Sequence, residues 1–455
     1  MSKLIWRDRP ASRRLRLAAF CIIAAATSTA ARAWDRGNLA DYQERRARLM
    51  ASTSGGVVAL FGYDENDIAA SVTTFHQNEE FYYLTGWNEP GAMMLLIPKA
   101  AAPNQPPSLE DEILYVPPRD ARLERWNGPR LDSQDPAAPE QTGFASVRST
   151  SLFHSDLLEA LKKFPKIYTE LTAQPESGED CFQQDEVAKL RKLAPLATLS
   201  DVRPILQSMR SVKSAGEITL IRRAVDNSVE AHLAAMKAVH PGAWEFEVSA
   251  LMKYEFDRRG SEWPSYPPIV GSGFFSTVLH YDADDHQMQA GDLVVMDVAG
   301  SYGGYAADIT RTLPVNRRFN ARQREIYDIV LAAQRAAIAA AKPGMMLRQG
   351  KNSLHQLAFD YINTHGKDLH GQSLGPYFIH GLGHSVGLNV HDPMDYERPL
   401  EPGMVVTMEP GIYIPEEKLG VRIEDMILIT KDGNEVLTGR LLSDPDQIEK
   451  IMAAK

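Results

Sequence analysis

The sequence of 455 residues contains very little cysteine, only Cys21 and Cys181. Cys21 lies in a segment that we expect to be removed from the mature protein, so no intrachain disulfide is expected. Long apolar runs are also missing. Residues 17–30 form a run that is shorter than the roughly 20 residues needed to cross a bilayer, and it is rich in Ala, Thr and Ser. The HExxH motif of the common zinc proteases is absent too.

The chain also lacks an excess of positive charge. Its formal net charge is −10, and removal of residues 1–33, which carry seven basic side chains and one acidic one, would change this to −16. Nucleic acids and anionic lipids bind to basic surfaces. We therefore expect no nucleic-acid partner.

The first 33 residues have the three parts of a secretory signal. Six basic residues precede the apolar stretch at 17–30, and the tripeptide ending at Ala33 has the small-x-small form of a cleavage site. We expect cleavage near Ala33, export to the periplasm or the medium, and no membrane anchor afterwards. The arginine pair at 13–14 leaves the export route open.

The length of the chain predicts two domains after the leader, because one ordinary core rarely grows this large. Residues 34–204 alternate helix-like and strand-like pieces, with a Pro-rich interruption at 99–112. This pattern predicts an N-terminal α/β domain.

Residues 205–455 predict an α+β domain. Long amphipathic helices are expected around 319–342 and 352–364, and Ser214 with Glu217 forms a capping-box pattern at the start of another helix. Hairpins rather than βαβ units lie between and after these helices, so the sheet should be antiparallel.

Residues 296–310, MDVAGSYGGYAADIT, predict a hairpin that carries two aspartates on apolar strands. If the two-residue loop is Tyr302-Gly303, Asp297 and Asp308 face each other directly across the ladder. Like charges in that position are destabilising unless a cation lies between them. A capping role for one of the two carboxylates, with the other exposed, is the alternative.

Residues 405–430 predict a second acidic hairpin. If the chain folds back between Glu416 and Glu417, then Glu409 and Glu424 are cross-strand partners, although Pro410 removes a ladder donor and weakens the register. Two acidic pairs on apolar strands of the same domain are difficult to explain as surface charge.

Between the two hairpins, the stretch FIHGLGHSVGLNVHD at 378–392 contains three histidines among several glycines. His380 and His384 have helical spacing, but the glycines make a regular helix unfavourable. Four carboxylates and at least one imidazole suit Mn²⁺, Zn²⁺ or Co²⁺ better than Ca²⁺. There are more carboxylates than one ion needs, so we expect two divalent ions, the arrangement typical of metal-assisted amide or ester hydrolysis.

These residues resemble the pita-bread metallopeptidases, a family that includes aminopeptidase P, prolidase, methionine aminopeptidase and the metal-free creatinase. The resemblance covers about residues 205–440 and includes the strings LHY (279–281), DITRT (308–312), MEPGIYI (408–414) and VRIED (421–425). It implies a catalytic pita-bread domain at 205–455 and a smaller creatinase-like domain at 34–204. The stretch at 75–98 resembles the N-terminal domain of aminopeptidase P and prolidase, which methionine aminopeptidases lack.

The resemblance also implies a role for each site residue. The metal ligands would be Asp297, Asp308, His384, Glu409 and Glu424, with Asp308 and Glu424 shared by both ions, most simply two Mn²⁺. The catalytic residues would be His280 and His391, which hold the scissile carbonyl and the oxyanion, His380 at the proline ring, Glu409 as proton shuttle, and Arg422, which orients carboxylates or forms a salt bridge on its strand. Trp87 is expected either in a wall of the pocket or in the core.

The implied activity is that of an Xaa-Pro aminopeptidase, in which a hydroxide held between the two ions attacks the bond before a proline at position two. A prolidase, which cuts only Xaa-Pro dipeptides, would carry the same motifs. A non-catalytic peptide-binding protein on the same fold is the alternative from another class, but the complete ligand set argues against it. Members of the family often form dimers or tetramers, so a homodimer or homotetramer is expected.

Overall fold

The computed structural model describes residues 37–64, 75–99, 105–171 and 180–454. The predicted leader at 1–33 lies outside these residues. One compact unit spans Arg36–Lys455. No helix within the described ranges combines the length and the apolar character needed to cross a membrane.

The N-terminal part of this unit is built on a six-stranded mixed sheet in the order β4-β3-β2-β1-β5-β6. The β1–β2 and β2–β3 pairs are antiparallel, whereas β3–β4, β1–β5 and β5–β6 are parallel. The strands are β1 (Val57–Phe61), β2 (Met93–Lys99), β3 (Ser108–Val116), β4 (Ser146–Ser149), β5 (Lys166–Thr169) and β6 (Thr198–Asp201). The helices are α2 (Leu39–Ser52), α3 (Glu79–Thr85), α4 (Glu124–Asn127), α5 (Ala138–Thr142), α6 (Phe153–Leu161) and α7 (Asp180–Leu193).

Both faces of this sheet are covered, which explains the continuous apolar run in β1. Val57, Ala59 and Phe61 belong to a core that also contains Phe153 of α6, whereas Val58 and Leu60 belong to a second core. Alternate residues of a strand point to opposite faces. The sheet ends at Asp201, just before the boundary expected at residue 204; that boundary stays a prediction.

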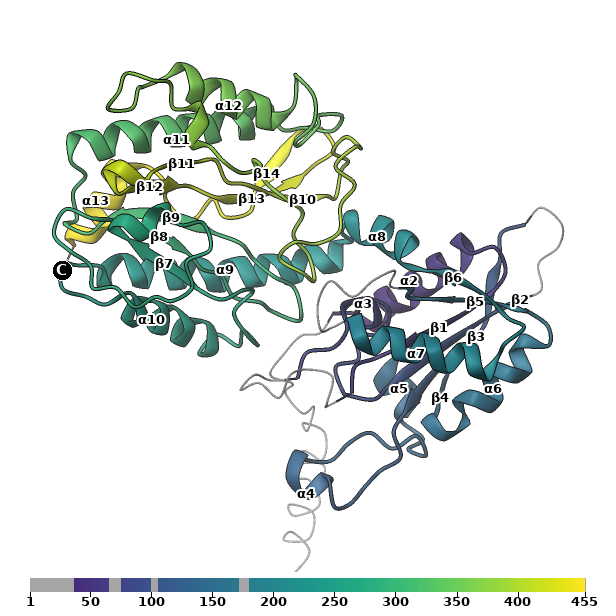
Figure 1. The fold of residues 1–455 in the computed structure, drawn as a ribbon. Helices are drawn as coiled ribbons and strands as arrows, with labels where there is room; N and C mark the ends of the chain where they lie inside the picture. The colour runs from purple at the N-terminus through teal and green to yellow at the C-terminus, as the bar shows by residue number, and fades with distance from the viewer. Residues whose placement is uncertain (1–36, 65–74, 100–104, 172–179, 455) are drawn as a thin grey trace, which may run out of the picture. The chain divides into compact units, whose positions relative to one another are not determined.

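The C-terminal part has α+β architecture, with strands lying between two pairs of helices (Figure 1). In the figure, α9 and α10 lie on one side of the strands and α11 and α12 on the other. The helices are α8 (Arg203–Ser211), α9 (Ala215–Ala238), α10 (Glu245–Asp257), α11 (Ala321–Ala340), α12 (Leu354–Thr364) and α13 (Pro445–Ala453). The predicted capping box at Ser214 and Glu217 is present at the start of α9, and both predicted long helices are confirmed.

Three small antiparallel sheets carry the hairpins. Their strands are β7 (Ile269–Ser272), β8 (Leu293–Asp297) and β9 (Thr310–Pro314); β10 (Val405–Met408), β13 (Asp425–Ile429) and β14 (Asn434–Val436); and β11 (Gly411–Ile414) with β12 (Leu419–Arg422). All pairings are antiparallel, as expected for hairpins.

The register predicted for the first acidic hairpin is wrong. Asp297 pairs with Thr310 rather than with Asp308. The two-residue loop is Gly303-Gly304, with φ angles of 59° and 82°, and not Tyr302-Gly303. A tight hairpin loop with positive φ at both central residues favours glycine at each of them, so the fold-back lies one residue later than expected. Asp308 precedes β9 and lies diagonally from Asp297.

The register predicted for the second acidic hairpin is confirmed. Met408 pairs with Asp425 and Gly411 pairs with Arg422. Glu409 follows Met408 and Glu424 precedes Asp425, so the two glutamates lie opposite each other between these two pairs. The ladder is interrupted at this point because Pro410 follows Glu409 and has no N–H to donate.

Candidate active site

A cavity of about 390 Å³ lies in the C-terminal part, and all nine predicted site residues line it. They are His280, Asp297, Asp308, His380, His384, His391, Glu409, Arg422 and Glu424. The structure therefore gathers around one space residues from β8, from the segment before β9, from the second hairpin and from residues 378–392, called here the glycine-rich loop.

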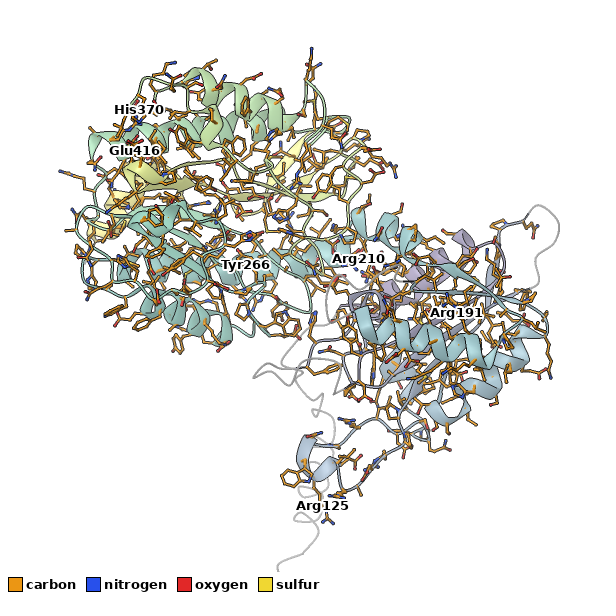
Figure 2. All side chains as sticks on the ribbon, in the orientation of Figure 1. Arg125, Arg191, Arg210, Tyr266, His370 and Glu416 are labelled. Atoms are coloured by element: carbon orange, nitrogen blue, oxygen red, sulfur yellow. The ribbon has the colours of Figure 1, made fainter. Side chains whose placement is uncertain are left out.

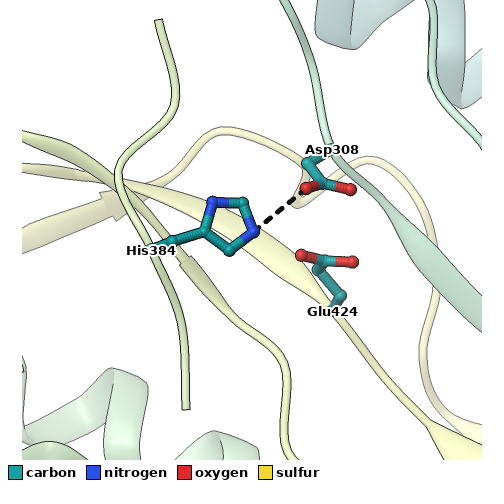
Figure 3. A group of neighbouring side chains, drawn as sticks. All are labelled: Asp308, His384 and Glu424. Carbon is teal, nitrogen blue, oxygen red and sulfur yellow. Dashed lines mark ion pairs between the residues drawn. The ribbon is translucent and has the colours of Figure 1, made fainter. Parts of the chain in front are cut away.

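The centre of the cavity is a buried cluster of Asp308, His384 and Glu424 (Figure 3). One ligand atom from each lies within 4.8 Å of the others. His384 Nε2 is 3.3 Å from Asp308 Oδ2 and 3.4 Å from Glu409 Oε1. His384 Nδ1–H donates to the carbonyl oxygen of Ser385 at 3.1 Å, which leaves Nε2 free to act as a ligand.

The third and fourth carboxylates, those of Asp297 and Glu409, border this cluster. The hydroxyl of Tyr266 lies 2.6 Å from Asp297 Oδ1 and 2.6 Å from Asp308 Oδ1. A phenol carries one proton and can donate to only one of these oxygens at a time. Burial, together with the two aspartates, raises the pKa of Tyr266 well above its usual value, so the hydroxyl stays protonated.

Arg422, on β12, contacts both the acidic cluster and a chain of hydrogen bonds. Its Nη2 lies 2.6 Å from Asp297 Oδ2, and its Nη1 donates to Tyr413 Oη at 3.0 Å. Because His380 Nδ1–H donates to the carbonyl oxygen of Gly381, the Nε2 atom of His380 accepts from the Tyr413 hydroxyl at 2.8 Å. Both ring nitrogens of His380 are therefore occupied.

The electrostatics of the cluster call for cations. Burial raises the pKa of Asp308. It also raises the pKa of Glu409 to about 7 and that of Glu424 well above its usual value. Neighbouring carboxylates add to each of these shifts. Although burial opposes it, Asp308 and Glu409 raise the pKa of His384 to about 9. Glu424 Oε1 is buried without a hydrogen-bond partner in the described chain. These donors fit divalent ions, which would neutralise the carboxylates and use the free oxygen.

Two other histidines are held neutral. Burial, and then Arg422, lower the pKa of His380 to about 4. Burial, and then His384, lower the pKa of His391 to about 4. The ring of His391 lies 4.0 Å from that of His384, centroid to centroid.

Behind His391, a buried ion network holds the glycine-rich loop. Asp392 accepts a hydrogen bond from Arg210 at 2.7 Å and lies 3.1 Å from Lys213 Nζ. Lys213 also donates to Ser385 Oγ at 2.9 Å. Both ends of the loop that carries His384 and His391 are thus tied to the segment around α8, where Arg210 is labelled in Figure 2.

Comparison with known proteins identifies the family. Residues 219–431 match the profile of metallopeptidase family M24, and residues 42–168 match that of the aminopeptidase P N-terminal domain. An Xaa-Pro aminopeptidase of Escherichia coli is 38% identical over 441 residues, which cover 91% of this chain and 98% of that protein. The chain belongs to metallopeptidase family M24.

Two further similar proteins agree with this assignment. A structure of aminopeptidase P from E. coli with the inhibitor Pro-Leu has a TM-score of 0.79 at 35% identity, and the match covers 91% of this chain and 98% of that one. An Xaa-Pro dipeptidase of Pyrococcus horikoshii is 39% identical over 286 residues, covering 62% of this chain and 78% of that protein.

Among the residues that line the M24 site, sequence reasoning missed a tyrosine and an arginine with polar groups in the cavity. Tyr266 and Arg348 both belong to the cavity wall. Tyr266 stands in the string WPSYPP, which carries no charge that would mark a ligand, and Arg348 is a single basic residue after the apolar residues 345–347 in the segment that follows α11. Trp87 is partly buried and packs against the core; it is not among the residues that line the cavity.

Proposed function

We propose that the chain is an Xaa-Pro aminopeptidase, a metallo-exopeptidase that removes the first residue of a peptide whose second residue is proline. The convergence of all nine site residues on one cavity carries this proposal. The names of the full-length relatives support it, because the E. coli protein matched over almost its whole length is an Xaa-Pro aminopeptidase.

The proposed metal ions are two divalent cations, most simply Mn²⁺, with Zn²⁺ or Co²⁺ as alternatives. Asp297 would hold one ion and His384 with Glu409 the other, while Asp308 and Glu424 would hold both. When bound, the ions would supply an activated water at neutral pH and a Lewis acid for the scissile carbonyl.

The protein's own residues would bind the substrate and move its proton. His280 and His391 would donate N–H hydrogen bonds to the scissile carbonyl oxygen as negative charge develops there. Glu409, which borders the cavity beside His384, would pass a proton to the leaving imino nitrogen of proline. His380, with both ring nitrogens occupied, would form a wall for the proline ring, and Arg422 would hold Asp297 in place.

A prolidase is the second candidate, because an Xaa-Pro dipeptidase also matches 62% of the chain. The two are separated by the hydrolysis of an Xaa-Pro-Yaa tripeptide beside its Xaa-Pro dipeptide, with protein starting at residue 34 and loaded with Mn²⁺. We expect release of the first residue from the tripeptide. Cleavage of the dipeptide alone would establish the prolidase.

We further propose that the protein is exported and acts as a homodimer or homotetramer. The basic, apolar and small-residue parts of the first 33 residues support export. N-terminal sequencing of the protein recovered outside the cytoplasm should start after Ala33. Light scattering of the purified mature protein should give two or four times the mass of one chain.

A further inference from the structure

The cavity wall contains an arginine that has no assigned part in the reaction. Two arginines line the cavity, Arg348 and Arg422. The charge of Arg422 is neutralised by Asp297 at 2.6 Å. Arg348, in contrast, forms no ion pair with any carboxylate of the described residues, although the cavity is strongly acidic.

Arg348 is nevertheless held in place. Its Nε donates to the carbonyl oxygen of Gly383 at 2.7 Å, and its guanidinium lies over the ring of Tyr396, 4.4 Å from the centroid. The backbone of Gly381 passes so close that a Cβ there would lie 2.6 Å from Arg348 Nε. Only Nε is used within the described protein, so the terminal Nη1 and Nη2 groups remain available for a ligand. A fixed guanidinium loses less entropy on binding than a free one.

The position of Arg348 places it on the leaving-group side, an argument that rests on the proposed function. The leaving proline nitrogen must lie near Glu409, and His380 Nδ1 is 3.8 Å from Glu409 Oε2. Gly381, which Arg348 contacts, directly follows His380. The part of the substrate that reaches Arg348 therefore lies beyond the scissile bond.

We propose that Arg348 determines specificity by binding a carboxylate on the leaving fragment. A guanidinium presents paired N–H donors that match a carboxylate, and such charge-assisted hydrogen bonds are stronger than neutral ones. The carboxylate can be the C-terminus of a short peptide or an acidic side chain after the proline. The site thus favours short or acidic Xaa-Pro peptides.

The test compares Ala-Pro-Ala with Ala-Pro-Ala-amide and Ala-Pro-Asp-amide as substrates of the Mn²⁺-loaded protein. For the unaltered protein we expect amidation of Ala-Pro-Ala to raise KM about tenfold with little change in kcat, as for the loss of one charged hydrogen bond. In Arg348→Met, the KM for Ala-Pro-Ala-amide divided by the KM for Ala-Pro-Ala (the amide-to-acid ratio) should fall to about 1. In Arg348→Lys this ratio should lie between about 1 and the value of the unaltered protein. A low KM for Ala-Pro-Asp-amide would show that a side chain is recognised; a high KM would assign recognition to the C-terminus.

Arg398→Met is the matched control, because Arg398 is exposed, pairs with Glu401 at 2.7 Å and does not line the cavity. A purely structural role of Arg348 would change both substrates equally, so an unchanged amide-to-acid ratio in Arg348→Met overturns the proposal. Calorimetric binding of Pro-Ala against Pro-Ala-amide gives the same comparison without turnover. Failure to cleave any Xaa-Pro peptide would refute the proposed function. The role of Arg348 would then still be decided by the difference in affinity between Pro-Ala and Pro-Ala-amide.

Discussion

Arg210 and Asp392 form an ion pair shielded from solvent, with 2.7 Å between Nη2 and Oδ1 and both side chains 2% exposed. Asp392 directly follows His391, so the pair fixes one end of a loop of the site. Arg210 also lies 2.9 Å from Glu79 Oε2 and 3.1 Å from Glu80 Oε1. Arg210→Met would leave three carboxylates with one fewer cation. We expect the free energy of unfolding to fall by about 3–5 kcal/mol, measured by urea denaturation.

The second variant of this pair tests the cause. In Arg210→Met/Asp392→Asn one of the three carboxylates that faced the lost cation is neutralised as well, while Lys213 loses its own ion pair, so only part of the lost stability should return. Arg222→Met breaks an exposed pair with Glu435 and should cost less than about 1 kcal/mol. A loss in Arg210→Met as small as that in Arg222→Met would contradict a stabilising role for the buried pair.

Asp308→Asn should abolish turnover. The change removes a negative charge that the proposed arrangement places between two dications, so we expect kcat to fall by at least about a thousandfold. Asp328→Asn, at an exposed position of α11 that pairs with Arg324, is the control and should stay active. Full activity in Asp308→Asn would refute the two-ion mechanism and favour a non-catalytic role for the cavity.

Metal removal should make stability depend on pH. Burial raises the pKa of Glu409 from 4.5 to about 7. Because this pKa is higher in the folded than in the unfolded state, the stabilising contribution of protonated Glu409 is fully present below about pH 4.5 and is lost as the pH rises through 7. After a chelator has removed the metal, the free energy of unfolding should therefore fall between about pH 4.5 and 7, by a contribution of order 3 kcal/mol. Thermal melting with and without Mn²⁺ measures this.

In the same experiment, added Mn²⁺ should raise the melting temperature most at neutral pH, where the carboxylates of the metal-free protein repel each other. Glu409→Gln provides the control, since it lacks the titrating group and should show a flatter pH dependence. A metal-free protein that gains stability from pH 4.5 to 7 would disprove this account of the cluster.

His391→Ala should separate catalysis from metal binding. The proposed role of His391 is to stabilise the oxyanion, so its removal should lower kcat by about 10²–10³. The variant should still bind two ions per chain, measured by elemental analysis. His384→Ala should lose metal instead. Loss of metal in His391→Ala would move this histidine into the ligand set.

Arg422→Lys should weaken the site although the charge is kept. A lysine ammonium cannot reproduce the guanidinium contacts with Asp297, Tyr413 and Thr310. Supporting residues of this kind typically change metal affinity or activity by about 10–100-fold, so we expect a loss in that range from metal titrations and kcat/KM. Arg322→Lys, whose partner is Glu417 away from the cavity, should behave like the unaltered protein.

The two hairpins show how far the sequence predicts this site. The partners of the second hairpin follow from its turn and were placed correctly, even across Pro410. In the first hairpin, Tyr302-Gly303 and Gly303-Gly304 were both possible loops, and only the backbone conformation of the two glycines decides between them. The register differed, yet Asp297 and Asp308 still reach the same cavity because the shift keeps them on one face.

Residues without a local pattern could not be predicted in this way. Tyr266 contacts the carboxylates of Asp297 and Asp308, which are distant in the sequence, and Arg348 contacts a carbonyl oxygen of a distant loop. Their roles depend on tertiary contacts, and neither the hydrophobic periodicity nor the spacing of charges around them differs from that of an ordinary loop.

The ligands of the candidate metal centre come from distant parts of the chain, from the end of β8 to the residue before β13. A growing polypeptide cannot assemble them until its last hairpin has been synthesised and has folded back onto β9, where the Glu424 N–H meets the Thr310 carbonyl. Non-local contacts of this kind form late in folding. A nascent or truncated chain that ends before Glu424 lacks part of the ligand set, so the proposed peptidase activity requires synthesis at least through the last hairpin.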